Sequence, residues 1–222
     1  MPDVDHTEYE TNIRIRQMEM DDFDQVVGLQ LACFPNMKPW GREHISAHLD
    51  TFPEGQLVVE VDGDVVASCS SLIIDFDEYE DGHTWMDVAG EGYISNHDPD
   101  GDTLYGIEIM VHLDYRGMKL ARRLYDARKQ LCRERNLKRI VVGGRIPGYA
   151  AVKEEMTPRE YVERVQRRDV FDPVLTAQLA NGFSLKRIIR SYLSTDTESA
   201  GYATLLEWVN LDYRPETGKR LL

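Results

Sequence analysis

Residues Tyr105–Arg135, YGIEIMVHLDYRGMKLARRLYDARKQLCRER, contain the pattern that decides the fold. The apolar run Ile107–Val111 predicts a strand, and a tight turn centred on Arg116-Gly117 follows it. From Met118 onward, apolar positions recur at spacings of four, three and four, at Leu120, Leu124, Ala127 and Leu131. This spacing predicts a helix with one buried face. The start of a helix leaves backbone N–H groups without intrahelical partners and carries positive potential, so this stretch predicts an anion-binding site.

Six further strands are expected on either side of this stretch. Their ranges are Asn12–Met18, Gln56–Asp62, Val65–Asp75, Lys138–Gly143, Leu185–Leu193 and Tyr202–Leu211. The D-G pair at Asp62-Gly63 joins two of them and predicts a hairpin.

Four further helices are expected from their start and stop signals. They run from Asp21 or Asp22 to Phe34-Pro35, over Arg42–Leu49, from Thr157, and from Asp172-Pro173 to Asn181-Gly182. In Thr157-Pro158-Arg159-Glu160, Thr is the N-cap, Pro takes the first helical position, and Glu follows three residues after the cap.

The order of these elements predicts one mixed α/β domain over residues 1–222, with a frayed start at 1–11. It carries an acidic loop insertion at 76–103 and a helical insertion at 146–172. The acidic insertion is 28 residues long, and connections of that length are usually functional or mobile.

The charge of the chain is large and unevenly distributed. The formal net charge of −13 argues against a nucleic-acid partner, because such binding depends on neutralising phosphates. Between Glu43 and Asp114 there are 18 Asp/Glu and no Lys or Arg, whereas Arg116–Arg139 has ten Lys/Arg. One interpretation is a pair of solvated surfaces. The other is a cationic wall for a phosphate-bearing cofactor that faces an acidic rim for a cationic acceptor.

The cysteines and the apolar runs indicate a cytoplasmic protein. Cys33, Cys69 and Cys132 are scattered without a CxxC pair, as is typical of a reducing compartment. The acidic N-terminus is unlike a secretory signal, and no apolar run approaches the roughly 20 residues that cross a bilayer. No membrane partner is expected. The oligomeric state is left open, a homodimer included.

The stretch VHLDYRGMKLARRL resembles the GNAT superfamily of acetyl-CoA-dependent N-acetyltransferases, whose pattern is V-x-P-x-Y-R-G-x-G-x-G/A. The matching residues are Val111, Tyr115, Arg116, Gly117 and Ala121. The element order also agrees, including Gly182-Phe183 after the penultimate helix. The resemblance implies the GNAT fold, a mixed, mostly antiparallel seven-stranded sheet flanked by helices, with acetyl-CoA as co-substrate. It further implies that an acetyl group is transferred to the primary amine of a small molecule or peptide by direct attack.

A second, narrower resemblance involves the acidic insertion, FDPVLTAQLANGF (Phe171–Phe183) and GYATLLEW (Gly201–Trp208). These segments are similar to the acetyltransferase-like domain that is fused ahead of a carbon–nitrogen hydrolase domain in some bacterial proteins. On that view the tail RPETGKRLL leads into a linker or marks a stand-alone version.

The first resemblance also assigns the cofactor-binding residues. The main chain of Ile109, Met110 and Val111 would pair with the pantetheine arm, and the Val111 N–H would stabilise the oxyanion. The pyrophosphate would lie against Arg116, Gly117, Met118, Lys119, Leu120, Ala121 and Arg122. Lys119 replaces the middle glycine of the pattern, so it either hinders the close approach of a phosphate or adds a charge to it.

The catalytic assignments are less complete. Glu108 is the expected general base, because a partly buried carboxylate has a raised pKa suited to accepting an ammonium proton. A solvent-facing Glu108 and His112 as the base are the alternatives. The family often has a Tyr that acts as the general acid, and the corresponding position here is Gln178. The candidate substitutes for this acid are Tyr149, Tyr192 and Tyr202. The absence of a Tyr at position 178 and of a glycine at position 119 motivates a rival function. In it, a GNAT-like domain binds acyl-CoA or a partner protein without turnover.

The acceptor is expected to enter between the loop with Trp40 and the acidic insertion. The carboxylates available there are Asp77, Glu78, Glu80, Asp81 and Asp87. Asp98-Pro-Asp100-Gly-Asp102 resembles part of a calcium loop, but it lacks the distal Glu, so a turn explains it better and no metal is expected.

Overall fold

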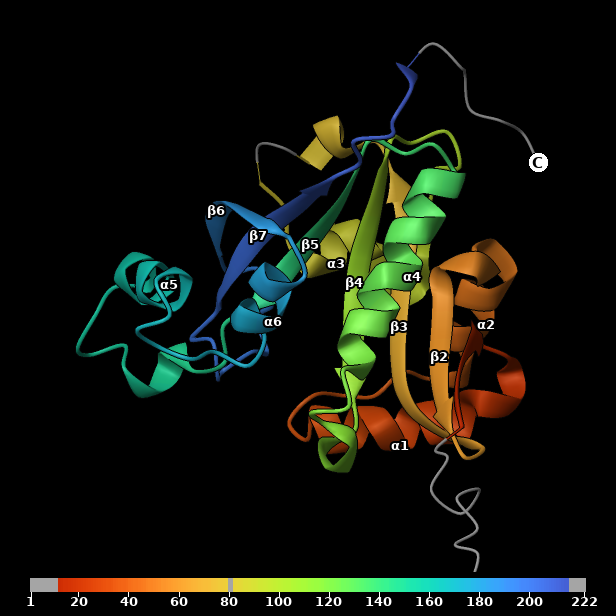
Figure 1. The fold of residues 1–222 in the computed structure, drawn as a ribbon, viewed down its shortest axis with the longest axis horizontal. Helices are drawn as coiled ribbons and strands as arrows, with labels where there is room; N and C mark the ends of the chain where they lie inside the picture. Colours follow the sequence, from red (N-terminus) through yellow and green to blue (C-terminus); the bar gives the residue numbers. More distant parts are fainter. Residues whose placement is uncertain (1–11, 80–81, 216–222) are drawn as a thin grey trace, which may run out of the picture.

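A computed structural model describes residues 12–79 and 82–215. Its centre is one seven-stranded sheet with the order β1-β2-β3-β4-β5-β7-β6 (Figure 1). The strands are β1 (Ile13–Gln17), β2 (Gln56–Val61), β3 (Asp64–Ile74), β4 (Thr103–Val111), β5 (Arg139–Arg145), β6 (Ser184–Arg190) and β7 (Tyr202–Val209). All neighbours are antiparallel except β4 and β5, which are parallel. The predicted mixed, mostly antiparallel sheet is therefore confirmed.

The helices cover both faces of the sheet. They are α1 (Phe23–Cys33), α2 (Arg42–Thr51), α3 (Trp85–Ala89), α4 (Leu120–Glu134), α5 (Pro158–Gln166) and α6 (Leu175–Ala180). Figure 1 shows α4 and α6 on the near face of the sheet, and α5 beyond β6 and β7. The apolar side chains agree with two layers. Val58 packs with α1 and α2, whereas its neighbour Val59 packs with Leu120 and Leu124 of α4.

Local chemistry explains several of these elements. Asp62 and Gly63 both adopt positive φ angles, of 54° and 98°, as the predicted D-G hairpin requires. At α5, the Thr157 side chain and the Glu160 side chain form the predicted reciprocal capping box. Gly182, with φ 81°, ends α6 as expected.

Several boundaries differ from the prediction by a few residues, and two of these differences have identifiable reasons. Strand β4 starts at Thr103 rather than Ile107, because it pairs with Ile74 at the far end of β3. Helix α4 starts at Leu120 rather than Met118, because Lys119 takes a left-handed conformation with φ 61°. Asp22 precedes α1 as predicted, but its carboxylate binds Arg16 at 2.7 Å and the Glu19 N–H at 2.8 Å and does not cap α1.

The described part of the acidic insertion is folded against the core. It contains η4 (Phe76–Tyr79), α3 and the irregular turn η5 (Gly90–Ile94). Phe76, Val88 and Ile94 are buried in the largest apolar cluster, so the backbone of this acidic segment is anchored to the core.

Three expectations fall wholly or partly outside the described residues: the frayed start at 1–11, the carboxylates Glu80 and Asp81, and most of the tail at 214–222. Among the residues that the structure does describe, no helix combines the length and apolar character that a membrane span requires.

Candidate active site

The site is organised by a gap between the two parallel strands at the centre of the sheet. Strands β4 and β5 pair from Thr103–Arg139 to Gly106–Val142, and their ladder then stops. Strand β4 continues to Val111 and β5 to Arg145, so residues 107–111 face an edge that β5 has left. An exposed strand edge offers unpaired N–H and C=O groups to a ligand.

The register with β3 shows which main-chain groups face that gap. The His112 N–H donates to the Val66 carbonyl at 2.9 Å, and hydrogen-bonded pairs alternate along an antiparallel ladder. Met110 therefore pairs with β3, while Ile109 and Val111 direct their main-chain groups toward the gap. The Val111 carbonyl accepts a contact from the Cys33 thiol at 3.3 Å on that side.

A bulge marks the place where β4 leaves β5. Ser70 pairs with Glu108 and Ser71 with Gly106, so Ile107 is the extra residue. The Arg128 side chain from α4 is only 2% exposed and fills the bulge. Its guanidinium donates to the Ser71 hydroxyl at 3.0 Å, to the Ser70 carbonyl at 2.7 Å and to the Glu108 carbonyl. The charge of Arg128 is thus used to hold the carbonyls of the bulged strands.

The start of α4 has the properties of an anion site. The first intrahelical bond runs from the Arg123 N–H to the Lys119 carbonyl, so the N–H groups of Leu120, Ala121 and Arg122 lack helical acceptors. Gly117 has φ 89°, and a Cβ built there would meet no atom within 4 Å, so the turn borders open space. The left-handed φ of Lys119 is the conformation that a glycine would supply.

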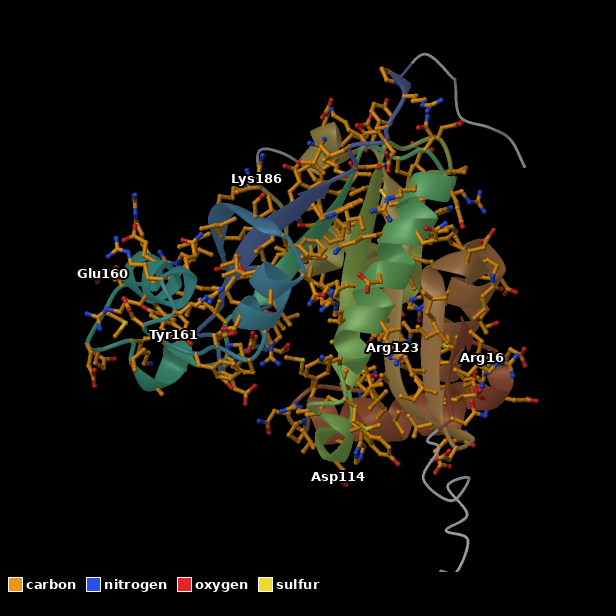
Figure 2. The ribbon with its side chains drawn as sticks, in the orientation of Figure 1. Arg16, Asp114, Arg123, Glu160, Tyr161 and Lys186 are labelled. Carbon is orange, nitrogen blue, oxygen red and sulfur yellow. The ribbon has the colours of Figure 1, made fainter. Side chains whose placement is uncertain are left out.

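Cations surround these amides. Arg116, Lys119 and Arg123 are exposed, and within the described residues none of them lies within 4.0 Å of a carboxylate. Figure 2 shows Arg123 on the N-terminal part of α4, above the turn that carries Asp114. Arg122 makes only a marginal 4.0 Å contact with Asp126. Free amides, a helix dipole and unpaired cations together fit the pyrophosphate of coenzyme A.

The remaining predicted residues support this end of the site. The Met118 side chain is exposed at its rim, and the Leu120 side chain is buried against β2 and β3. The Ala121 side chain is half-buried against the main core. The predicted cofactor residues thus lie on β4, in the turn before α4 and in the first turn of α4. The Met110 main chain is the exception to the predicted pairing, because it is bonded to β3 and does not face the gap.

Glu108 lies beside the gap on the face of the sheet opposite α4. Its carboxylate accepts hydrogen bonds from the Trp40 indole and the Ser68 hydroxyl, both at 3.2 Å, and from the Ser70 hydroxyl at 3.5 Å. Burial raises the pKa of Glu108, and the three donors and the Arg128 cation only partly oppose this. Because the side chain is still half-buried rather than sealed, the carboxyl group suits proton transfer.

His112, the alternative base, has a structural role. Its Nδ1 accepts the Asp114 N–H at 3.3 Å and caps the short turn Leu113–Tyr115. This engagement leaves Glu108 as the better placed of the two candidates.

The candidate acid residues occupy different places. Gln178 is 3% exposed on α6, and its Oε1 has no hydrogen-bond partner in the described part of the chain. The Tyr149 hydroxyl donates to the Met156 carbonyl at 3.3 Å, and Tyr202 packs edge-on against Tyr149 at 5.7 Å. The Tyr192 hydroxyl is 2.8 Å from that of Tyr105. The three substitute tyrosines are therefore not gathered at one point.

A fourth tyrosine adjoins Gln178. Tyr125 of α4 packs against Phe183 at 5.3 Å and lies beside the Gln178 amide. The sequence reasoning missed it, because Tyr125 follows Leu124 and has the position of an ordinary core residue. The signal that could have found it is a polar-tipped side chain at a buried helix position in the stretch expected to bind the cofactor.

The side of Glu108 that faces the Trp40 loop is aromatic. Trp40 lies 5.6 Å from Trp85 of the acidic insertion, whose indole donates to the Ile107 carbonyl at 2.9 Å. The Trp40 loop and the acidic insertion, between which the acceptor is expected to enter, are therefore in contact at these two rings. Asp87 in that insertion caps α3 by accepting the Thr84 N–H, so its carboxylate is engaged locally.

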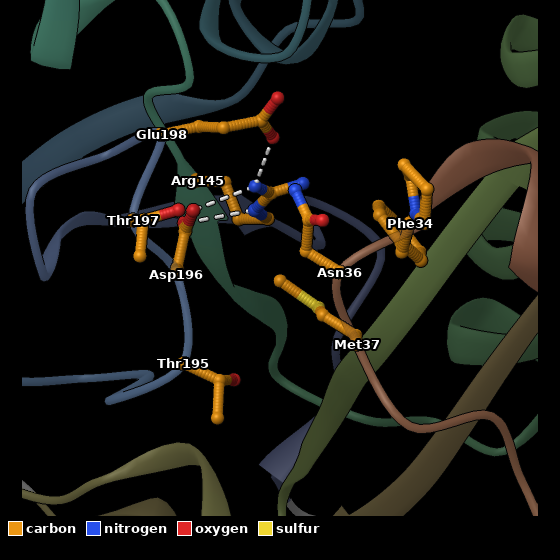
Figure 3. Close-up of a pocket in the computed structure, with 9 residues that line it drawn as sticks. Phe34, Asn36, Met37, Arg145, Thr195, Asp196, Thr197 and Glu198 are labelled. Atoms are coloured by element: carbon orange, nitrogen blue, oxygen red, sulfur yellow. Dashed lines mark hydrogen bonds and ion pairs between the residues drawn. The ribbon is translucent and has the colours of Figure 1, made fainter.

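A small hollow lies near this side, between the α1–α2 loop and the β6–β7 loop (Figure 3). Residues 34–37 line one side, residues 195–198 line the other, and Arg145 lies between them. The Arg145 guanidinium binds Asp196 at 2.6 and 2.8 Å and Glu198 at 2.6 Å. The same guanidinium lies 5.3 Å from the Phe34 ring centre, so it links the two loops.

No metal is suggested by the described residues. Within 12–79 and 82–215, no group of three or more His, Cys, Asp or Glu side chains is arranged to hold an ion. In the segment that resembles a calcium loop, the Gly101 N–H donates to the Asp98 carbonyl at 2.9 Å, and the Asp100 N–H donates to the Asp98 side chain at 2.8 Å. This segment is the predicted turn. Cys33, Cys69 and Cys132 are all free thiols.

A family model and two curated relatives match the sequence. The model, described as the acetyltransferase (GNAT) family, matches residues 23–153, more than half of the chain. The uncharacterized N-acetyltransferase YkwB of Bacillus subtilis is 35% identical over 206 residues, with 91% of each chain covered. The probable hydrolase YhcX of the same organism is 55% identical over 217 residues, which are 98% of this chain and 42% of that protein. The chain thus spans less than half the length of YhcX.

Solved structures share the fold. The loading GNATL domain of CurA from Lyngbya majuscula matches with a TM-score of 0.78 and 19% identity, over 89% of this chain and 98% of that domain. The GphF GNAT-like decarboxylase in complex with isobutyryl-CoA matches with a TM-score of 0.70 and 21% identity, over 88% of this chain and 98% of that one. At such identities the likeness concerns the arrangement of the chain alone.

Proposed function

Because the chain belongs to the acetyltransferase (GNAT) family, we propose that it transfers an acetyl group from acetyl-CoA to a primary amine with Glu108 as the general base. The family resemblance drawn from the sequence is confirmed by the family match. The co-substrate, the amine class and the roles of individual residues are the content of the proposal.

The observation that carries the proposal is the open edge of β4 between two chemically different ends. At one end, the free amides and cations at the start of α4 suit a pyrophosphate. At the other end, Glu108 offers a carboxylate of raised pKa. The strand between them presents the Ile109 and Val111 main-chain groups to a pantetheine arm, which carries amides able to pair like a strand. This is the layout that a long, phosphate-bearing thioester requires.

The proposed chemistry divides among the chain's own groups. Coenzyme A would supply the activated thioester, held by the β4 edge and the α4 amides. Glu108 accepts a proton from the ammonium group, directly or through a water, so that the nitrogen becomes a nucleophile. The Val111 N–H, directed into the gap, stabilises the oxygen that becomes negative during the attack. Trp40 and Trp85 border the same face and exclude bulk water from it.

Cofactor binding is tested first, by calorimetry with acetyl-CoA and with dephospho- and desulfo-coenzyme A. Binding is expected to weaken with rising salt, because cations and amides form the anion site. Arg116→Ala should weaken binding several-fold. A matched control, Arg159→Ala, removes an exposed cation from the distant helix α5 and should leave affinity unchanged. No heat of binding at saturating acetyl-CoA would remove the proposal.

Turnover is tested by thiol release over a panel of primary amines. Glu108→Gln should lower kcat/KM at neutral pH by about 10²-fold or more, because the amine must then deprotonate without a base. The deficit should shrink at high pH, where the amine loses its proton in solution. An equal deficit at every pH would assign Glu108 a structural role.

A second function is favoured by one observation, the non-ionisable Gln178 in the place where the family often has its acid. In that version the chain binds acyl-CoA, as the solved GphF decarboxylase binds isobutyryl-CoA, without passing the acyl group to an amine. Tight cofactor binding with no amine raising thiol release above hydrolysis would favour this version. The longer relative called a probable hydrolase motivates the same screen on any hydrolase domain joined to this one.

A further inference from the structure

We propose that Tyr125 of α4 donates the proton to the departing thiolate of coenzyme A, and that Gln178 of α6 positions its hydroxyl. This inference rests on the proposed function and adds a catalytic residue and a positioning residue to it. It answers the question that the sequence raises, namely which group replaces the tyrosine absent at position 178.

The first observation is an unsatisfied amide at the gap. The Gln178 side chain is 3% exposed, and its Oε1 has no partner within the described residues. A buried carbonyl without a donor is unfavourable, so such a group is usually bonded to a ligand or a water. A Cβ built on Gly144 of β5 would lie 2.2 Å from this Oε1, so the amide presses against the strand just beyond the last β4–β5 pair. The pantetheine amides supply N–H groups that match this acceptor.

The second observation is the hydroxyl beside that amide. Tyr125 is 2% exposed, and the Gln178 side chain is close enough to act on its hydroxyl as a hydrogen-bond donor. Burial raises the pKa of Tyr125 to about 12, although the Arg128 cation and the Gln178 amide oppose this. Tyr125 therefore keeps its proton at neutral pH. If the Gln178 amide donates to the phenol oxygen, the O–H remains free to donate elsewhere.

The third observation is that Tyr125 and Glu108 lie on opposite faces of the sheet. Ser70 directs its hydroxyl to Glu108, and the next residue, Ser71, directs its hydroxyl to Arg128 of α4. Because adjacent strand residues point to opposite faces, Glu108 is on the face away from α4. Tyr125, one turn before Arg128, is on the α4 face. A thioester lying in the gap would thus have the base on one face and a hydroxyl on the other, so that the two proton transfers use separate groups.

Tyr125 and Tyr192 lie on opposite faces of the sheet. A Cβ on Gly143 would meet the Tyr192 ring at 2.1 Å, whereas a Cβ on the adjacent Gly144 would meet Gln178. The Tyr192 carbonyl also accepts the Trp85 N–H at 2.8 Å. Tyr192 is therefore on the amine side of the sheet, and its hydroxyl is already bonded to Tyr105. Tyr149 of the helical insertion packs against Tyr202 at the start of β7, and the Tyr149 hydroxyl is bonded to the Met156 carbonyl.

The amine nitrogen forms a bond to the carbonyl carbon, and the carbon–sulfur bond breaks with its electron pair on sulfur. The Tyr125 O–H proton passes to sulfur and yields the free thiol, and the tyrosinate regains a proton from water. Glu108 takes one ammonium proton and the product nitrogen loses another, so one proton in total is released to solvent.

The test measures the bound thiol and needs no knowledge of the acceptor. Coenzyme A is bound to the intact protein, and its thiolate absorbance in the far ultraviolet is titrated against pH. A hydroxyl that donates to the thiolate lowers the pKa of the bound thiol. Tyr125→Phe should therefore raise that pKa by about one to two units, the equivalent of one hydrogen bond to a charged group. Gln178→Leu should raise it by less, because the hydroxyl is present but no longer held.

Tyr149→Phe is the matched control, because it removes one buried phenol hydroxyl from outside the gap and should leave the thiol pKa unchanged. An unchanged thiol pKa in Tyr125→Phe, with coenzyme A still bound, overturns the inference and leaves the proposed function intact. A response to Tyr192→Phe in place of Tyr125→Phe overturns it as well. Absence of coenzyme A binding by the wild-type protein defeats the proposed function and the inference together.

Kinetics give a second readout where an amine substrate has been found. Tyr125→Phe should lower kcat about 10²-fold while the dissociation constant of acetyl-CoA changes less than threefold, as expected for general acid catalysis. A loss of acetyl-CoA affinity with kcat unchanged would show that Tyr125 serves binding alone and would refute its role as the acid.

Discussion

The Arg145 cluster offers a sharp test of how the loops beside the site are held. Arg145 at the end of β5 binds two carboxylates of the β6–β7 loop (Figure 3). The Asp196 side chain is 2% exposed and binds through both oxygens, whereas the Glu198 side chain is 58% exposed and binds through one. The two partners share one cation and differ in burial, so each serves as the control for the other.

Asp196→Asn should be costly, because it leaves a half-buried guanidinium with only a solvent-exposed partner. Breaking a buried ion pair by removing one member costs about 3–5 kcal/mol in the free energy of unfolding. For a chain of this length, a loss of about 3 kcal/mol lowers Tm by roughly 6–12 °C. Glu198→Gln should cost no more than about 1 kcal/mol, the usual limit for an exposed pair.

The pH dependence of the stability lost in Asp196→Asn provides an independent test. Burial raises the pKa of Asp196, but the hydrogen bonds from Arg145 and Ser199 outweigh it, so the pKa lies below its ordinary value. A carboxylate with a lowered pKa stabilises the native state fully above its unfolded pKa of about 3.9 and loses that contribution as the pH falls through the native value. The difference in the free energy of unfolding between wild type and Asp196→Asn should therefore be constant near neutral pH and decrease below about pH 3.9.

Urea unfolding followed by circular dichroism and tryptophan fluorescence measures both variants at several pH values. The m-value should stay constant, so that the midpoint shift reports the change in stability. Equal costs for Asp196→Asn and Glu198→Gln, or a cost below about 1 kcal/mol for the former, would refute the reasoning from burial. With an amine substrate in hand, Asp196→Asn should raise KM for the amine more than KM for acetyl-CoA, because the hollow lies on the acceptor side.

Three other predictions concern the gap itself. Lys119→Gly should stabilise the protein by up to about 1 kcal/mol in urea unfolding, because a left-handed lysine is strained, while acetyl-CoA affinity falls and becomes less sensitive to salt. Glu108→Gln should raise Tm by a few degrees at pH 8 and little at pH 4: burial raises the pKa of Glu108, so its ionised form costs stability only at the higher pH. Gly144→Ala should cost about 1–3 kcal/mol in urea unfolding and weaken coenzyme A binding, because its Cβ displaces Gln178, whereas Gly28→Ala, where a Cβ meets nothing within 4 Å, should not destabilise.

The parts of the fold that the sequence predicted are those that local chemistry determines. The D-G turn at Asp62-Gly63, the capping box at Thr157 and the glycine at 182 each settle a few backbone angles without help from distant residues. The spacing of Leu120, Leu124 and Leu131 predicted α4, because a helix repeats its buried face along the chain. Apart from the D-G hairpin, strand pairing followed from the family resemblance rather than from a local signal.

The site was predicted only in part, because some of its side chains depend on partners that are distant in the sequence. Arg128 belongs to a run of ten cations that the sequence could equally assign to solvent, yet its guanidinium is buried in the bulge of β4. Its spacing of four residues from Leu124 places Arg128 on the buried face of α4, but the groups that explain a buried cation there come from β3 and β4. Tyr125 was missed on the same grounds. Its polar neighbour, the Gln178 side chain, lies 53 positions away in the sequence.

The bulge at Ile107 links the open edge of β4 to the raised pKa of Glu108. By adding a residue to β4, it changes which face receives the side chains that follow, and so it directs Glu108 away from α4. Arg128 then satisfies the carbonyls that the bulge frees, and its charge lies across the strand from the Glu108 carboxylate and not beside it. A direct ion pair would have lowered the pKa of Glu108 and made it a poor base. Because the strand separates them, burial prevails and the pKa of Glu108 stays raised, with the cation still close enough to moderate it. The distortion that opens the edge of β4 to a ligand is thus also the one that gives the adjacent carboxylate its basicity.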